Sequence, residues 1–233
     1  DEYTVIENPL LSERTSIRIG GEAIAEVRLY TSDGLEQLPG LLARIGGRIR
    51  VVGEGSNVLA ADGQLPFVLV NMDRHGEPQV LAEEDGAVLV RAEAGLRLPA
   101  FLAWAAKKGL SGLEGLAGIP GSVGGALAMN AGSFGVETGS LMRSVQVFSP
   151  EQGFVERQRS DLVFGYRRCV LPGPASWFLI TQAVFALTRS RTEDIRARMR
   201  DIYLKKQASQ PVAAKTAGCV FKNPGPDAPA GRL

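Results

Sequence analysis

Two short runs of apolar and β-branched residues lie near the start of the chain, RIRVVG at 48–53 and PFVLVNM at 66–72. Both runs are bounded by Gly or Asp, which is the pattern of short β-strands. The segment GEGSN, residues 53–57, continues directly from the first run. The pattern therefore predicts a glycine-rich turn at the end of a strand.

The segment 31–47 places leucines at positions 35, 38, 41 and 42, which is the spacing of one helix face. Ser32 or Asp33 is the expected N-terminal cap and Gly46 the expected stop, while Pro39 is expected to kink or restart the helix. With the two strands, this helix makes the first 75 residues a small α/β unit.

The rest of the chain alternates between strand-like and helical patterns. Residues 144–150 and 154–160 are joined by Pro-Glu-Gln-Gly, which predicts an antiparallel hairpin. The clearest helix spans 192–211, with Thr192 as the expected cap. Its core-facing residues are expected to be Ile195, Met199, Ile202 and Tyr203. Further strands are expected at 87–95 and 177–187, and a helix at 98–110. The predicted fold class is α+β.

Charge and cysteine content limit the classes of function. The 26 Lys and Arg residues nearly balance the 25 Asp and Glu residues, so no polybasic surface indicates nucleic acid or an anionic membrane. A small molecule or another protein is the expected partner. Cys169 and Cys219 lie fifty positions apart and fit neither a zinc site nor a disulfide framework. We therefore expect no metal, and reduced thiols in the cytoplasm. Acidic residues at the start of the chain do not resemble a signal peptide.

Glycine recurs at every third position from 109 to 124, and residues 115–136 carry no charged side chain. Collagen-like structure is excluded, because six triplets with one proline are too few. A membrane span fits the length, but not the glycine, proline and polar content. A flexible solvated loop would be more polar. The favoured interpretation is a buried loop whose apolar residues are Leu116, Ile119, Val123, Leu127 and Met129.

A buried loop with few polar side chains must satisfy its backbone N–H groups, and a ligand rich in acceptors can do so. A diphosphate is such a ligand, because consecutive N–H groups can converge on an anion. GEGSN offers the same chemistry at a strand end, although neither segment matches the GxGxxG or GxxxxGK motifs. Together the two segments predict one dinucleotide held from two sides.

Five motifs follow one another along the chain: RTSIRIGGEA at 14–23, GEGSN at 53–57, the glycine-rich segment up to Gly135, FGYR at 164–167, and QP followed by AGCVFKNP at 217–224. In this order they resemble the motifs of the UDP-N-acetylenolpyruvoylglucosamine reductases. The resemblance implies the fold of vanillyl-alcohol-oxidase-type flavoproteins. Its domains are expected at 1–75 (FAD-binding), at 76–205 (a second FAD-binding, α+β domain with an antiparallel sheet) and at 206–233 (the start of a substrate-binding domain).

For ligands, the resemblance implies non-covalent FAD and NADPH as co-substrate. His75 is accordingly expected at the surface rather than as a flavin tether. The residues implied to bind FAD are Gly53, Glu54, Gly55, Ser56, Asn57, Gly118, Ile119, Pro120, Gly121, Ser122, Gly124, Gly125, Asn130, Ala131 and Gly132. The implied reaction is reduction of a nucleotide sugar, UDP-N-acetylglucosamine enolpyruvate, to UDP-N-acetylmuramate in peptidoglycan precursor synthesis.

Hydride addition to C3 of the enolpyruvyl ether builds negative charge on C2 and the carboxylate, which a cation can stabilise. The resemblance assigns that role to Arg167, with a surface ion pair as the alternative, and expects Arg168 to face solvent. It also assigns Tyr166, Lys222 and Asn223 to the substrate. Cys219 stands where the family carries a serine or cysteine that donates a proton. A thiol can serve as a proton donor because it is mostly protonated at neutral pH. Cys169 is expected to be a small apolar core residue.

The Pro/Gly-rich tail after residue 222 predicts that the polypeptide continues beyond Leu233, with a disordered tail as the alternative. The resemblance implies that a catalytic glutamate lies beyond Leu233, so the 233-residue chain is expected to bind FAD but to turn over poorly by itself. Two other functions stay open at this stage. One is an FAD-dependent sugar or alcohol oxidase of the same fold, and the other is a non-catalytic nucleotide-binding module.

Overall fold

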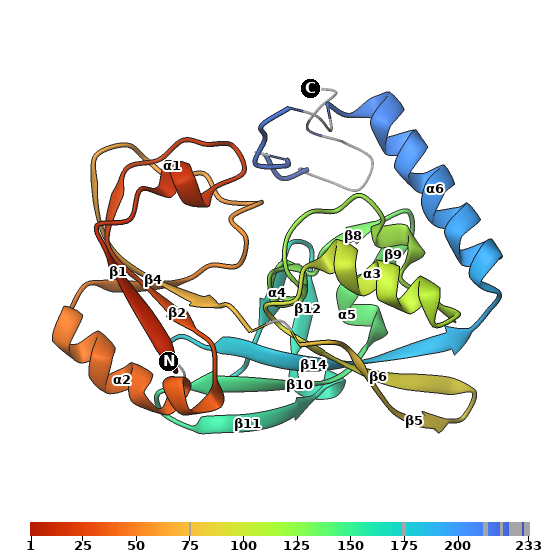
Figure 1. The fold of residues 1–233 in the computed structure, drawn as a ribbon, viewed down its shortest axis with the longest axis horizontal. Helices are drawn as coiled ribbons and strands as arrows, with labels where there is room; N and C mark the ends of the chain where they lie inside the picture. Colours follow the sequence, from red (N-terminus) through yellow and green to blue (C-terminus); the bar gives the residue numbers. More distant parts are fainter. Residues whose placement is uncertain (75, 174–175, 212–213, 220, 224–229, 231–233) are drawn as a thin grey trace.

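The structure is a computed structural model that describes residues 1–74, 76–173, 176–211, 214–219, 221–223 and 230. The position of His75 and the expectation attached to it lie outside these residues, as do Val220 and Pro224 of the AGCVFKNP motif. Two β-sheets lie next to each other in the molecule, each with helices on one face (Figure 1).

The first sheet is mixed and has the strand order β1-β2-β4-β3. Strand β2 pairs with β1 in antiparallel fashion and with β4 in parallel fashion, and β3 pairs with β4 in parallel fashion. The predicted strands at 48–53 and 66–72 are confirmed as β3 and β4. The strands span Tyr3–Glu7 (β1), Glu22–Leu29 (β2), Arg48–Val51 (β3) and Gln64–Met72 (β4), and the short helix α1 spans Leu11–Arg14.

Helix α2, Ser32–Ile45, packs its leucines against this sheet, as the spacing predicted. Its cap is Thr31 rather than Ser32 or Asp33, because Thr31 has extended backbone and its hydroxyl accepts a hydrogen bond from the Gly34 N–H at 3.2 Å. The helix also continues through Pro39 instead of restarting there, and it ends at Gly46 as predicted. Packing of the leucine face outweighs the one backbone hydrogen bond that the proline cannot make.

The second sheet is antiparallel, with the order β11-β10-β14-β6-β5 and β7 added at β14. The predicted hairpin and the strands around 87–95 and 177–187 are confirmed as members of this sheet. Residues of β6 alternate between buried and half-buried, as a strand covered on one face requires. The strands span Gln79–Glu84 (β5), Ala87–Glu93 (β6), Leu110–Ser111 (β7), Met142–Ser149 (β10), Gly153–Gln158 (β11) and Leu179–Arg189 (β14).

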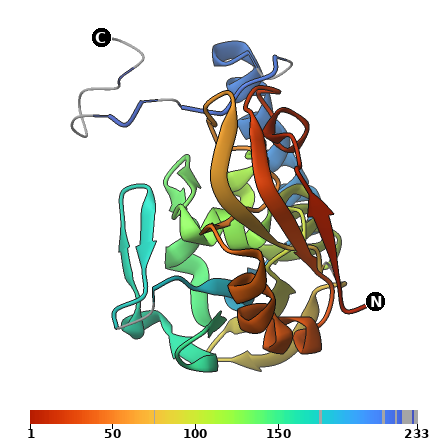
Figure 2. The ribbon, with the colours of Figure 1, turned by 90° about the vertical axis from the view of Figure 1, so that its left-hand side faces the viewer.

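Short helices and two small hairpins lie over the second sheet (Figure 1). The β12–β13 hairpin, Val163–Gly165 and Arg168–Val170, stands away from the sheet (Figure 2). The uncharged glycine-rich segment is not loop throughout, because its apolar side chains are spaced to bury one face of a short helix, α4. The remaining elements are α3 (Leu98–Lys107), η1 (Glu114–Leu116), α4 (Val123–Ala128), β8 (Gly132–Ser133), β9 (Val136–Glu137), α5 (Thr138–Leu141) and η2 (Arg159–Asp161).

Helix α6, Thr192–Ser209, follows β14 and packs on the helices above the second sheet. Thr192 does not cap it, since its hydroxyl donates to the Ala106 carbonyl at 3.1 Å and fastens the helix start to α3. Ile195 is buried as predicted, whereas Tyr203 is 45% exposed and lies at the edge of the contact face. The expected domain boundary between residues 205 and 206 falls within this unbroken helix.

Glu114 and Arg198 form the main polar contact between α6 and η1. The nearly buried Glu114 carboxylate accepts from Arg198 Nη2 at 2.6 Å, from Ser111 Oγ at 2.8 Å and from the Gly112 N–H at 2.7 Å. Burial raises the pKa of Glu114, but these hydrogen bonds outweigh burial and leave the pKa below its ordinary value.

Apolar side chains from both sheets share one cluster. Phe148 of β10 and Leu179 of β14 pack with the leucines of α2 and with Val27 and Val70 of the first sheet. This contact fixes the two sheets relative to each other, and so positions the turn after β3 opposite the segment around α4. None of the helices in the described part of the chain is long and apolar enough to cross a membrane.

Candidate functional site

The turn after β3, residues 53–57, is shaped by a glycine. Gly55 has a φ of +67°, and a Cβ there would overlap the Arg14 carbonyl oxygen. No other residue fits this conformation and this contact together. The backbone of the turn therefore lies close to the loop after α1, and Ser56 and Asn57 are left to face away from that loop.

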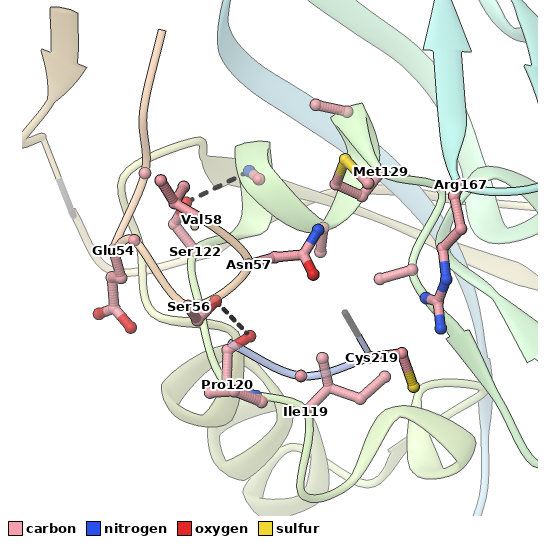
Figure 3. Close-up of a pocket in the computed structure, with 18 of the residues that line it drawn as sticks. Glu54, Ser56, Asn57, Val58, Ile119, Pro120, Ser122, Met129, Arg167 and Cys219 are labelled. Atoms are coloured by element: carbon pink, nitrogen blue, oxygen red, sulfur yellow. Dashed lines mark hydrogen bonds between the residues drawn. The ribbon is translucent and has the colours of Figure 1, made fainter. Parts of the chain in front are cut away.

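The second glycine-rich segment meets this turn directly. Ser56 Oγ lies 3.4 Å from the Pro120 carbonyl oxygen, to which it donates (Figure 3). Gly121 has a φ of +109°, and a Cβ there would lie 2.7 Å from Ser56 Oγ. Ser122 caps α4 by accepting from the Gly125 N–H at 3.2 Å. The two segments predicted to hold one ligand from two sides are thus brought together.

Between them lies a cavity of about 340 Å³. Every residue of the two segments predicted to bind a cofactor lines it, except Gly124 and Asn130. Predicted residues that line the cavity are Gly53, Glu54, Gly55, Ser56, Asn57, Gly118, Ile119, Pro120, Gly121, Ser122, Gly125, Ala131 and Gly132. The Glu54 carboxylate itself points away from the cavity and accepts from Arg97 Nε at 2.7 Å (Figure 3).

Gly124 lines a smaller cavity of about 130 Å³ that shares Gly53, Ser122 and Gly125 with the larger one. Its other walls are mostly apolar and include Phe178 and Ile180. The two cavities therefore adjoin at these shared residues.

Asn130 uses its side chain inside the protein. Its amide donates to Glu137 Oε2 at 2.9 Å and to the Gly165 carbonyl at 3.3 Å, and its Oδ1 accepts from the Gly139 N–H at 3.0 Å. The residue is 5% exposed and has a φ of +41°, a conformation that asparagine tolerates better than most residues. In this structure Asn130 is positioned to hold the segment after α4 against the β12–β13 hairpin.

Arg167 reaches the cavity from the two-residue turn of the β12–β13 hairpin. Its φ of +58° places it at the turn position that glycine usually occupies, at a cost of about 1 kcal/mol for other residues. The guanidinium carbon lies 5.6 Å from the centroid of the Tyr166 ring. Arg168 is exposed, as predicted. The hairpin turn therefore directs one of two adjacent arginines into the cavity.

Cys219 lies at the same end of the cavity as Arg167, opposite Glu54 and Ser122 (Figure 3). Its side chain is exposed. Cys169 is different, because it packs against the apolar core, and burial raises its pKa to about 11. The two cysteines thus differ in environment as the sequence predicted.

The predicted substrate residues lie around this end of the cavity. Lys222 lines an adjoining cleft of about 170 Å³ together with Asn57, Arg167 and Cys219. Tyr166 is 51% exposed, and its hydroxyl accepts from the Asn223 N–H at 3.3 Å. The FGYR motif and the AGCVFKNP motif therefore meet in space.

Several residues that line the cavity were not predicted as site residues, among them Met129, Lys206 and Gln210. The sequence analysis gave Met129 as an apolar residue of the buried loop and assigned no role to Lys206 or Gln210. Lys206 is 5% exposed, and its Nζ donates to the Ala117 carbonyl at 2.6 Å. The sequence carried no signal for it, because the periodicity of α6 does not show that its end passes over the glycine-rich segment.

Comparison with known proteins defines the class first. A family model described as an FAD binding domain matches residues 25–156, more than half of the chain, so this is an FAD-binding protein. The UDP-N-acetylenolpyruvoylglucosamine reductase of Nitratidesulfovibrio vulgaris is 51% identical over 229 residues, which cover 98% of this chain and 77% of that protein. The reductase of Oleidesulfovibrio alaskensis is 46% identical, with coverage of 98% and 77%. The chain belongs to the family of UDP-N-acetylenolpyruvoylglucosamine reductases.

Solved structures agree with this assignment. The crystal structure of the Thermus caldophilus UDP-N-acetylenolpyruvylglucosamine reductase is 34% identical in sequence and matches with a TM-score of 0.81, covering 99% of this chain and 78% of that one. A solvent-stable cholesterol oxidase matches 81% of this chain with a TM-score of 0.59 at 14% identity. The second likeness concerns the fold alone. The α+β fold class predicted from the sequence is thus confirmed.

Proposed function

We propose that this chain binds FAD in the cavity between its two glycine-rich segments and, with NADPH, reduces UDP-N-acetylglucosamine enolpyruvate to UDP-N-acetylmuramate in the cytoplasm. The observation that carries the proposal is the meeting of Arg167 and Cys219 at one end of the cavity that both segments line. A cation and a proton donor are two of the groups that this reduction requires of the protein.

The cavity fits FAD in its chemistry. Gly55 and Gly121 leave room that a Cβ would fill, so backbone N–H groups can approach a diphosphate closely. The side chains of Ser56 and Asn57 add polar contacts at the same place. The smaller apolar cavity, with Phe178 and Ile180 in its wall, would take the adenine. The flavin ring would then lie toward Arg167 and Cys219.

When bound, FAD supplies hydride transfer from NADPH to C3 of the enolpyruvyl group. Arg167 binds the substrate carboxylate and stabilises the negative charge that develops on it and on C2. The planar guanidinium can hold both carboxylate oxygens at once, which also orients C3. Its position in the hairpin turn fixes the direction of approach.

Cys219 completes the reduction by donating its thiol proton to C2. A C–H bond forms at C2, the S–H bond breaks, and the charge moves from the substrate to the sulfur as a thiolate. Because Cys219 is exposed, water can return the proton after product leaves. Lys222 in the adjoining cleft would bind the diphosphate of the nucleotide sugar, with Tyr166 and Asn223 bordering the entrance.

The two half-reactions separate these roles. In the full-length protein, we expect Cys219→Ala to slow substrate reduction by about 10²–10⁴-fold, the usual contribution of a general acid, while NADPH still bleaches the flavin absorbance at the normal rate. Cys219→Ser recovers part of the loss. Cys169→Ala is the matched control and leaves both half-reactions unchanged. Equal loss of both half-reactions in Cys219→Ala contradicts the assignment.

Arg167→Lys tests the cation in the same way, with Arg168→Lys as its matched control. We expect Arg167→Lys to slow substrate reduction by at least tenfold and Arg168→Lys to have no effect, since an ammonium cannot bind a carboxylate in the bidentate manner. An enzyme that forms hydrogen peroxide from a sugar or alcohol, without any response to NADPH, would instead be an oxidase. A purified protein that takes up no FAD would reject both enzymatic proposals.

A further inference from the structure

Lys206 is a buried lysine in the last turn of α6, beside an exposed one. Its side chain is 5% exposed, whereas Lys205 faces solvent. The Lys206 Nζ donates to the Ala117 carbonyl at 2.6 Å, directly before Gly118 of the glycine-rich segment. A Cβ on Gly118 would lie 3.2 Å from Lys206 Cδ, so the lysine stem and this loop are in close contact.

The burial of this ammonium is only partly compensated inside the protein. The ion pairs among the described residues do not include Lys206, and burial lowers its pKa with no carboxylate opposing the shift. The face of the Phe134 ring lies 5.8 Å away and gives a weak cation–π contact. An ammonium has three N–H donors, and the Ala117 carbonyl accepts one of them.

Lys206 also lines the wall of the larger cavity, as do Gly118, Gln210 and Cys219. A buried charge is normally balanced by an opposite charge. FAD carries a negatively charged diphosphate, and its ring gains negative charge on two-electron reduction. A positive group in the wall of the cavity is thus placed to balance a charge that the ligand brings.

We propose that Lys206 is a positioning residue whose ammonium provides the counter-charge for the bound cofactor while holding the Ala117–Gly118 peptide in place. The inference rests on the proposed function, since it requires FAD in this cavity. The negative charge it balances is either that of the diphosphate or that of the reduced ring, and the two sources have different consequences.

The experiment measures FAD binding by apo-protein and the midpoint potential of the bound flavin in four variants. Lys206→Met removes charge and donor, Lys206→Gln removes the charge but keeps a donor for the Ala117 carbonyl, and Lys206→Arg keeps the charge. Lys205→Met is the matched control, because it removes the same charge from an exposed neighbouring position. Thermal unfolding of each apo-protein confirms that it folds.

If Lys206 faces the diphosphate, Lys206→Met and Lys206→Gln weaken binding of oxidised FAD at least tenfold and leave the midpoint potential of the bound flavin unchanged. If it faces the reduced ring, oxidised FAD binds normally and the potential falls by about 30 mV or more, which is a tenfold change in a two-electron equilibrium. In both cases Lys206→Arg keeps most of the affinity and most of the potential of the parent protein, and Lys205→Met behaves like the parent protein.

Normal FAD affinity and a normal flavin potential in Lys206→Gln would overturn the inference. Lys206 would then only hold the Ala117–Gly118 peptide in place. Failure of the proposed function looks different, because then neither the parent protein nor Lys205→Met would bind FAD at all.

Discussion

The hydroxyl of Tyr166 accepts a hydrogen bond from the backbone N–H of Asn223 at 3.3 Å, across 57 positions of sequence. This contact joins the turn that carries Arg167 to the segment that carries Cys219. The two groups proposed to act on the substrate are thereby coupled through one side chain. The contact is half-exposed, so its contribution to stability is small and its contribution to position is the larger one.

Tyr166→Phe should therefore free the segment around Asn223 without unfolding the protein. Loss of one exposed hydrogen bond costs about 0.5–1.5 kcal/mol locally. We expect faster hydrogen exchange at the Asn223 amide and a higher KM for the nucleotide sugar, with FAD affinity unchanged. Tyr203→Phe, which removes the hydroxyl of a 45% exposed tyrosine of α6, is the control. An unchanged exchange rate at Asn223 would show that the contact does not hold the segment.

Gly55→Ala should abolish FAD binding. The substitution forces a side chain into a left-handed conformation and into the Arg14 carbonyl, so the 53–57 turn must move. We expect at least a hundredfold loss of FAD affinity, measured by fluorescence titration of apo-protein.

Gly153→Ala is the matched control for Gly55→Ala. It has a similar φ of +64°, with nothing within 4 Å of the added Cβ. It should cost about 1–2 kcal/mol in unfolding free energy and leave FAD affinity intact. Equal effects of the two substitutions on FAD affinity would mean that conformational strain, and not the contact with Arg14, is decisive.

Asn130→Ala separates a structural asparagine from one that faces the ligand. It leaves the Gly139 N–H unpaired and puts alanine at a positive φ, which together cost about 2–4 kcal/mol in urea unfolding. FAD affinity of the folded variant should stay within threefold of the parent protein. Asn57→Ala, whose amide points into the cavity (Figure 3), should show the opposite pattern. A large affinity loss in Asn130→Ala with normal stability would return Asn130 to the cofactor site.

Glu114→Gln should change how the free energy of unfolding falls with pH in the acid range. The folded-state pKa of Glu114 is lowered, so its stabilising contribution is fully present above the unfolded pKa of about 4.3 and is lost as pH falls through the folded value. The variant should be about 1–3 kcal/mol less stable at pH 7, and the difference should shrink below pH 4. Glu83→Gln, at an exposed pair with Arg189, is expected to leave the unfolding midpoint unchanged.

Periodicity predicted the three longest helices and six of the strands in the two large sheets, because leucine spacing in α2 and alternation in β6 reflect burial directly. The caps were harder to predict, since several Ser, Thr and Asp residues stand at the starts of α2 and α6. Thr31 caps α2 because its backbone is extended rather than helical. Thr192 does not cap α6, because its hydroxyl donates a hydrogen bond to the Ala106 carbonyl of α3. The outcome at Thr192 depends on a tertiary contact that has no local pattern.

In the candidate site, the glycine segments could be predicted because a close backbone approach excludes other residues. The roles of Arg167 and Cys219 came from the resemblance, since an isolated arginine or cysteine has many possible roles. Lys206 could not be found at all. Its burial results from the path of the end of α6 over the glycine-rich segment, which the polar sequence of that helix conceals.

The cavity draws its walls from four parts of the chain, around residues 51–58 and 118–133, at Arg167, and at residues 206, 210, 218 and 219. All of these parts must be synthesised, and α6 must pack against the glycine-rich segment, before the cavity can retain the nucleotide. Stable retention of the nucleotide therefore requires that residues from all of these parts have folded together. Separating the two sheets would then also cost the binding free energy of the bound nucleotide.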